Sequence, residues 1–78
     1  MARYYFDLRD VEDFVLDEHG TELRDLSAVR NEAARTLSGL AWDAMRKDTQ
    51  VQQMSIEVRD CVGPVLEVKL AFVISCKL

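Results

Sequence analysis

Hydrophobic and polar residues alternate along most of the chain, on either side of one long segment with helical periodicity. Every second residue of segment 3–9 is apolar (Tyr4, Phe6 and Leu8), which is the pattern of a strand with one buried face. A short apolar run at residues 14–16 predicts a second strand that pairs back on the first. Residues 21–23 follow the next turn and are expected to continue as a short extended piece.

Residues 27–47 are the only segment that predicts a long helix. Asp25 is the favoured N-cap, because its carboxylate can accept a hydrogen bond from a free N–H of the first turn and Leu26 then falls on the apolar face. The apolar positions gather on one side of this helix. They are Leu26, Val29, Ala33, Leu37, Leu40, Ala41 and Ala44. This stripe is rich in alanine, so the helix can lie close against a sheet.

Residues 54–59 and 65–75 alternate like the first strand and predict two more strands, joined by a hairpin turn. Their inward residues must share a face, so the numbers of paired residues must have an even sum. A three-residue loop, residues 61–63, built as a type I turn closed by a left-handed Gly63, satisfies this condition. The predicted pairs are Val58 with Leu66, Ile56 with Val68, and Met54 with Leu70.

These elements predict one α+β domain spanning residues 1–78. Its antiparallel sheet would have three to four strands, in the sequence order ββαββ, with the long helix packed on one face. No apolar run approaches the ~18 residues that a membrane span requires. The first residues also lack the pattern of a signal peptide. We therefore expect a cytoplasmic protein without membrane contact.

The end of the last strand is one candidate interaction surface. In the even register residues 71–78 overhang the preceding strand, and residues 70–74 are apolar on both faces, unlike Glu67 and Lys69. Such a strand end is either covered or used at an interface. Two alternatives follow: a central position beside the first strand, or the edge of a homodimer at which Ala71 and Val73 contact a second copy.

The outward face of the helix is the other candidate surface. Trp42 lies roughly 150° from the centre of the apolar stripe. It shares this face with Arg35, Ser38, Gly39 and Arg46. Tryptophan and arginine are enriched at binding hot spots, and the two small residues leave a shallow bed beside the indole. Either an arginine or a loop covers the ring, or this face contacts a partner protein.

Charge is spread unevenly along the chain, whose net charge is −4. The first 25 residues include eight acidic residues and only three arginines. Repulsion between these carboxylates and phosphate groups would oppose direct contact with nucleic acid. Charged turns of this kind usually form a solvated hairpin. The alternative is that these carboxylates mimic nucleic acid towards a basic partner.

No group of residues predicts a catalytic site, a cofactor site or a metal site. His19 is the only histidine, and the spacing of the neighbouring acids does not fit a calcium loop. A nucleophile signature and a glycine-rich phosphate loop are both missing. We expect no enzyme, no cofactor and no metal ligand, and keep a site at His19 only as the third hypothesis.

The two cysteines, Cys61 and Cys76, lie in the hairpin turn and near the far end of the last strand. At ~3.3 Å per residue they should be about 35–40 Å apart. A disulfide needs Cα atoms within about 7 Å. We therefore expect free thiols in a reducing compartment.

Several segments together resemble an uncharacterised family of short bacterial proteins that carries only a domain-of-unknown-function label. The resemblance rests on residues 3–10 and 17–26, with the D-E-x-G turn and the D-L helix entry, and on Ala28, Ala33 and Ala34. It extends over residues 56–60 and 65–70, and so over nearly the whole chain. The family implies no activity and no catalytic residue.

A weaker resemblance, in the order of elements alone, is to the N-terminal domain of HicB-type antitoxins. In those proteins this partly RNase-H-like domain binds a small RNA-cleaving toxin, and a separate module binds DNA. The present chain has no second module, so the resemblance implies only an inhibitor-like role.

Our leading hypothesis is a non-enzymatic protein-binding module that forms a homodimer, with another protein as a further candidate partner. The alternative is an acidic inhibitor or antitoxin-like protein that binds a basic or nucleic-acid-binding partner.

Overall fold

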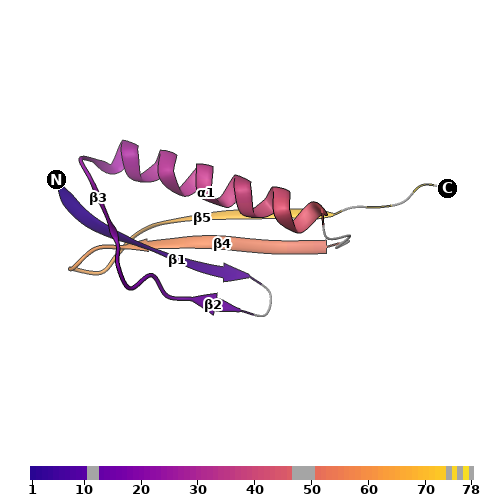
Figure 1. The fold of residues 1–78 in the computed structure, drawn as a ribbon, viewed down its shortest axis with the longest axis horizontal. Coiled ribbons are helices and arrows are strands. Elements are labelled where there is room, and N and C mark those ends of the chain that lie inside the picture. Colours follow the sequence, from indigo (N-terminus) through magenta and orange to yellow (C-terminus); the bar gives the residue numbers. More distant parts are fainter. Residues whose placement is uncertain (11–12, 47–50, 74, 76, 78) are drawn as a thin grey trace.

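The computed structural model describes residues 1–10, 13–46, 51–73, 75 and 77. Its elements in chain order are β1 (Ala2–Asp10), β2 (Phe14–Val15), β3 (Thr21–Leu23), α1 (Leu26–Arg46), β4 (Val51–Arg59) and β5 (Pro64–Val73). All strand pairs are antiparallel, and the helix lies along one face of the sheet (Figure 1). The predicted fold class is confirmed. The sheet has five strands, because the short extended piece β3 also pairs with β1.

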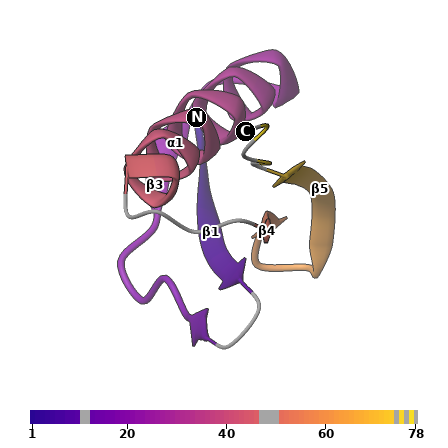
Figure 2. The same cartoon turned by 90° about the vertical axis from the view of Figure 1, so that its right-hand side faces the viewer.

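The strand order in the sheet is β2-β1-β4-β5, with β3 beside β2 along the same edge of β1. Figure 2 looks along the sheet and shows α1 on one side of it, with β5 at the edge farthest from β2. The central position therefore belongs to β4. This rules out the alternative in which the last strand pairs with the first, because β4 lies between them.

The predicted register of the last hairpin is confirmed: Val58 pairs with Leu66, and the other two predicted pairs are also present. However, β4 begins at Val51 instead of Met54. Residues 71–73 consequently pair with residues 53–51, so the predicted overhang of these residues is wrong. The polar residues Gln52 and Gln53 obscured this start, since they look like linker. β5 ends at Val73, whereas the predicted strand ran to Ser75, which lies outside it. The predictions for Ile74 and Cys76 lie outside the described residues, as does the predicted helix end at Lys47.

The turn of this hairpin is longer than predicted. The register shifts between Val58 and Arg59, so that Arg59 pairs with Pro64 and residues 60–63 form the loop. The N–H of Asp60 donates to the carbonyl of Gly63 at 3.0 Å. Gly63 has the expected positive φ, but at 156° it lies far from the left-handed value of about 57°. The extra residue in β5 is Val65, which has no partner in β4 and forms a bulge.

The core lies between one stripe of α1 and the strands beneath it. Its buried members are Val29, Ala33, Leu37 and Ala41 from the helix and Met54, Ile56 and Val58 from β4. Inward side chains of β1 and β5 pack around them, half-buried. The two alanines let the helix approach β4 closely, as predicted from the stripe.

Asp25 caps the helix as predicted: its carboxylate accepts the N–H of Ala28 at 2.9 Å. Leu26, however, is 53% exposed, although its angle places it on the apolar stripe. It lies in the first turn, and Figure 1 shows that end of the helix standing clear of β4 and β5. The wheel angle gives the direction of a side chain but not whether the sheet extends beneath it. The prediction that Leu26 belongs to the buried stripe is therefore wrong.

Candidate functional site

The edge of the sheet at β1 is closed by elements of its own chain. β3 pairs with residues 2–4 of β1, and β2 pairs with Leu8 and Arg9. In the gap between them the carboxylate of Asp17 takes the place of a strand, because its Oδ2 accepts the N–H of Phe6 at 3.0 Å. Two short strands and one side chain thus satisfy much of this backbone edge.

Asp17 is held by the turn that follows it. Its Oδ1 accepts the N–H groups of His19 and Gly20, both at 3.1 Å. Burial by itself would raise the pKa of Asp17, but the N–H donors of Phe6, Gly20 and His19, with the charge of His19, outweigh it and lower this pKa. Gly20 has φ 74°, and a Cβ there would stand 2.8 Å from Cγ of Arg3. The D-E-x-G pattern therefore marks a structural turn.

A partly buried ion pair joins this turn to the centre of the sheet. Asp7 is 5% exposed, and its Oδ2 receives Nε of Arg59 at 2.9 Å. Oδ1 of Asp7 accepts the N–H of Asp17 at 2.9 Å, and Arg59 also donates to the carbonyl of Asp17. The guanidinium of Arg59 stacks over the ring of Tyr5, 4.5 Å from its centroid. This network positions β1, β4 and the turn relative to one another.

The opposite edge, at β5, has no comparable protection. β5 has ten residues and pairs only with β4 among the strands described. Beyond Pro64 and the bulge at Val65, its edge carries no blocking device except Lys69. Ala71 is exposed and Val73 is 68% exposed, so the predicted interaction residues do lie at a surface.

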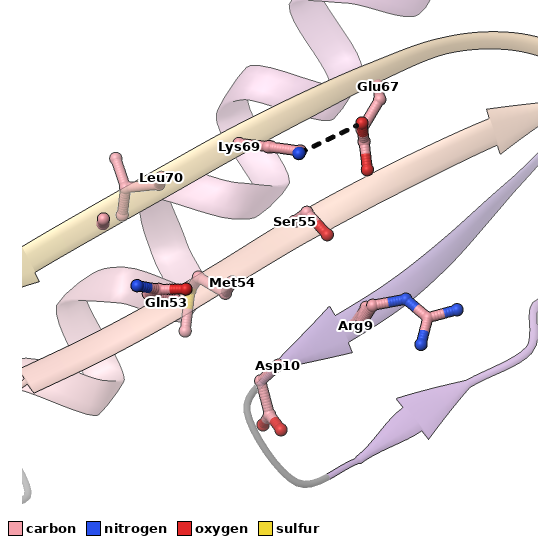
Figure 3. A pocket seen from close by; sticks show the side chains of 9 residues that line it. Arg9, Asp10, Gln53, Met54, Ser55, Glu67, Lys69 and Leu70 are labelled. Carbon is pink, nitrogen blue, oxygen red and sulfur yellow. Dashed lines mark ion pairs between the residues drawn. The ribbon is translucent and has the colours of Figure 1, made fainter.

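Ala71 and Val73 point to the sheet face that α1 does not cover. The pairing of Met54 with Leu70 is on the helix face, so the next pair, Gln53 with Ala71, is on the other one. Within the described chain no helix or further strand covers this open face. A shallow hollow of about 710 Å³ lies on it, between Arg9 on one side and Lys69 on the other (Figure 3).

The charges of the open face form rows across the strands. An acidic row runs from Asp7 through Glu57 to Glu67, because these residues are direct partners in the sheet. The next row contains Arg9, Ser55 and Lys69. Ion pairs link the rows, with N–O distances of 2.7 Å for Arg9 and Glu57 and 3.7 Å for Lys69 and Glu67. Glu67, at the free edge, therefore has a weaker partner than Glu57.

The outward helix face is exposed, a point that the sequence left open. Trp42 is 63% exposed, and the arginine–aromatic stacks present among the described residues involve Phe14 and Tyr5 instead. Neither an arginine nor a described loop covers the indole. Ser38 donates to the carbonyl of Ala34 at 2.8 Å, and Gly39 has open space around it.

The two arginines of this face differ in their contacts. Arg35 forms an ion pair with Glu32. Arg46 is exposed in the last turn, where its positive charge interacts favourably with the negative end of the helix dipole. Trp42, Arg35, Ser38, Gly39 and Arg46 thus form one surface. It lies on the opposite side of the molecule from Ala71 and Val73, so the structure does not join the two candidate surfaces.

His19 serves the fold through its backbone. Its N–H donates to Asp17, and its carbonyl accepts Nη1 of Arg3 at 2.8 Å, while the residue itself is exposed. Over the residues that the structure describes, no group of three or more histidine, cysteine, aspartate or glutamate side chains could hold a metal ion. Cys61 is exposed with a free thiol.

Glu67 and Lys69 were not among the predicted site residues, although their signal was visible. They are opposite charges two positions apart, on one face of an otherwise apolar strand. These two charges become candidates for an intermolecular contact only because β5 lies at the edge of the sheet.

Over the described part of the chain, the architecture is that of a small α+β protein with one helix, one open sheet face and one open edge. The chain belongs to the family described as "Domain of unknown function (DUF6894)", whose family model matches residues 3–71. The predicted resemblance to such a family is thereby confirmed. No curated protein and no solved structure matches the chain, and the resemblance to HicB-type antitoxins is not shown. No helix in the described residues has the length and apolar character to cross a membrane.

Proposed function

We propose that this protein is a non-enzymatic protein-binding module that forms a homodimer through the free edge of β5. The observation that carries the proposal is the difference between the two edges of the sheet. The edge at β1 is closed by β2, β3 and Asp17, whereas the ten residues of β5 have a strand on one side only among the residues that the structure describes. An open edge is a template for another strand, and a second copy supplies one of the same length.

The apolar end of β5 supports this proposal. Ala71 and Val73 are exposed next to the half-buried Phe72, so that a partner strand would remove apolar surface from water on both faces. Free edges that must stay single usually carry several charges or prolines along their length. Here Pro64 and the bulge at Val65 occupy only the beginning of the strand, and its only charges are Glu67 and Lys69, of opposite sign.

The surface around Trp42 would remain outside such a dimer. Trp42 is on the helix, away from the β5 edge, and is exposed without an aromatic or arginine cover. We propose this face as the contact for a further protein. The free thiol of Cys61 supports a reducing, cytoplasmic location.

The alternative of an acidic inhibitor has less support. Of the acidic residues up to position 25, several already serve the fold by pairing with an arginine or by accepting backbone N–H groups. They are Asp7, Asp10, Asp17, Glu22 and Asp25. A mimic of nucleic acid needs carboxylates that are free to meet a basic partner.

Size-exclusion chromatography with light scattering tests the proposal. The chain has a mass of 8.9 kDa, so the dimer would have about twice that mass. The edge variant Ala71→Lys with Val73→Lys should shift the protein to the monomer. Gln53→Lys is the matched control, since it adds a charge to the same face, opposite Ala71 but on the central strand. It should leave the dimer intact, as should Trp42→Ala.

A wild-type protein that remains monomeric up to high micromolar concentration would contradict the proposal. A dimer that dissociates on Trp42→Ala but not on the edge substitutions would place the interface on the helix instead. Circular dichroism of each variant confirms that the fold is retained.

A further inference from the structure

Resting on the proposed homodimer, we infer that the two β5 strands pair antiparallel about a two-fold axis at Val68, so that Glu67 of each copy faces Lys69 of the other. The partner is a second copy of this chain, recognised by the charge pattern of its open sheet face. The inference specifies which residues of the two strands are opposed. An open edge alone does not specify them.

Symmetry restricts the possible registers. Antiparallel strands related by a two-fold axis place the same sheet face of both copies on one side, so opposed residues must point to the same face. The numbers of opposed residues must then have an even sum. The axis therefore lies midway between the two copies of one residue of β5, which face each other across it. Each choice of that residue gives a different set of charge contacts.

The charges of β5 select one of these registers. An axis at Glu67 would place the two copies of Glu67 face to face, and an axis at Lys69 would do the same with the lysines. An axis at Val68 instead places Glu67 opposite Lys69 twice. Opposite charges across a strand pair stabilise it, whereas like charges directly opposite destabilise it.

The neighbouring strand makes this contact more favourable. Within one copy, Glu67 is the direct partner of Glu57, and its own cation Lys69 stands 3.7 Å away. A lysine from the second copy would flank Glu67 on its other side. The acidic row Asp7–Glu57–Glu67 of one copy would then continue into the row Lys69–Ser55–Arg9 of the other.

The apolar face agrees with the same axis. It places Leu66 opposite Leu70, and Val68 opposite its own copy, on the side of the sheet that faces the helices. The bulge at Val65 and the missing N–H of Pro64 lie outside this central stretch of residues 66–70. In this register Ala71 stands opposite Val65 and Val73 opposite Gly63, so the apolar end of each β5 packs beside the bulge of the other copy. The bulge and Pro64 limit the backbone hydrogen bonds to the centre without removing this apolar contact.

A charge-swap cycle tests the register. Glu67→Lys alone, or Lys69→Glu alone, turns both crossed contacts into like-charge contacts. Each substitution should weaken dimerisation about tenfold, on the scale of exposed ion pairs. The double variant E67K/K69E restores opposite charges and should bring the dissociation constant back to within about threefold of wild type. Glu18→Lys makes the same charge change at an exposed site away from β5 and should have no effect.

The dissociation constants are measured by analytical ultracentrifugation, at low salt and again at about 0.5 M salt, where screening should reduce the differences. Failure of the double variant to recover, in a protein that still dimerises, overturns the register but not the dimer. A monomeric wild type overturns the proposed function itself. Tighter association of Lys69→Ala would show that Lys69 guards the edge against pairing, and tighter association of Glu67→Gln, which removes a Glu–Glu contact, would place the axis at Glu67; either result refutes the inference.

Discussion

Replacing Asp17 by asparagine tests whether a side chain closes the β1 edge. The substitution keeps the shape of the residue but removes its charge and places an NH2 group where an oxygen accepted a hydrogen bond. The carboxylate accepts three backbone N–H groups, from Phe6, His19 and Gly20, at 3.0 to 3.1 Å. An amide can accept at one oxygen only, so at least one backbone N–H loses its partner.

The expected cost follows from these bonds. A buried N–H left without an acceptor costs about 1–3 kcal/mol, and hydrogen bonds to a charged acceptor are worth about 1.5–3 kcal/mol. The site is only half-buried, so water offsets part of this loss. We expect Asp17→Asn to lower the free energy of unfolding by roughly 2 kcal/mol at pH 7. For a domain of this size that corresponds to a fall in Tm of about 10 °C.

The same bonds predict how this cost depends on pH. Burial alone would raise the pKa of Asp17, but the N–H donors lower it, so the folded state holds this carboxyl ionised more strongly than the unfolded state does. A group with a lowered folded pKa stabilises the fold above its unfolded pKa, which is about 3.9. That contribution is lost as the pH falls through the lower folded pKa. The charge-dependent part of the difference between wild type and Asp17→Asn should therefore shrink below about pH 4.

Urea denaturation followed by circular dichroism, at pH 7 and at about pH 3, measures this difference. Glu18→Gln is the matched control, because Glu18 is the exposed neighbour of Asp17 and its replacement removes the same charge. It should change stability by less than about 0.5 kcal/mol at either pH. An Asp17→Asn cost that is equal at both pH values would refute the role of the charge. A cost no greater than that of Glu18→Gln would refute the closure of the edge by Asp17.

Three further predictions concern the turn, the helix cap and the core, each measured as a change in urea stability. Gly20→Ala should destabilise by more than about 1 kcal/mol, because φ is 74° and the new Cβ would stand 2.9 Å from the ring of Tyr5. Gly39→Ala, its control in open space on α1, should instead stabilise by up to ~1 kcal/mol; the reverse order would contradict both assignments. Asp25→Ala should cost about 1 kcal/mol by removing the helix cap, and an unchanged stability would show that the cap is dispensable. Ile56→Ala should cost about 2–5 kcal/mol, since Ile56 is 1% exposed, and a cost below 1 kcal/mol would contradict its central place in the core.

The candidate site residues show the limit of prediction from sequence most directly. The direction of Trp42, away from the apolar stripe, could be predicted, because a helix wheel alone sets which side chains point away from it, but whether an arginine or a loop covers the ring could not. The contact that we propose for Glu67 and Lys69 could not be predicted, because it depends on β5 lying at the edge of the sheet. Asp17 was visible only as part of a turn, and its contact with Phe6 joins residues that no local pattern relates.

The sequence by itself determined most of the elements, their faces and the parity of the register in the last hairpin. Alternation and helical spacing are local properties, and the even-sum rule limits Val58 to partners on the buried face, of which Leu66 is the one observed, although the turn and bulge beside it differ from the predicted loop. The tertiary structure alone decided that β1 pairs with β4 and leaves β5 free, that Leu26 extends beyond the sheet, and that β4 reaches back to Val51. These features depend on which distant segments meet, and pairing between distant segments is set by the packing of the whole core rather than by any local period.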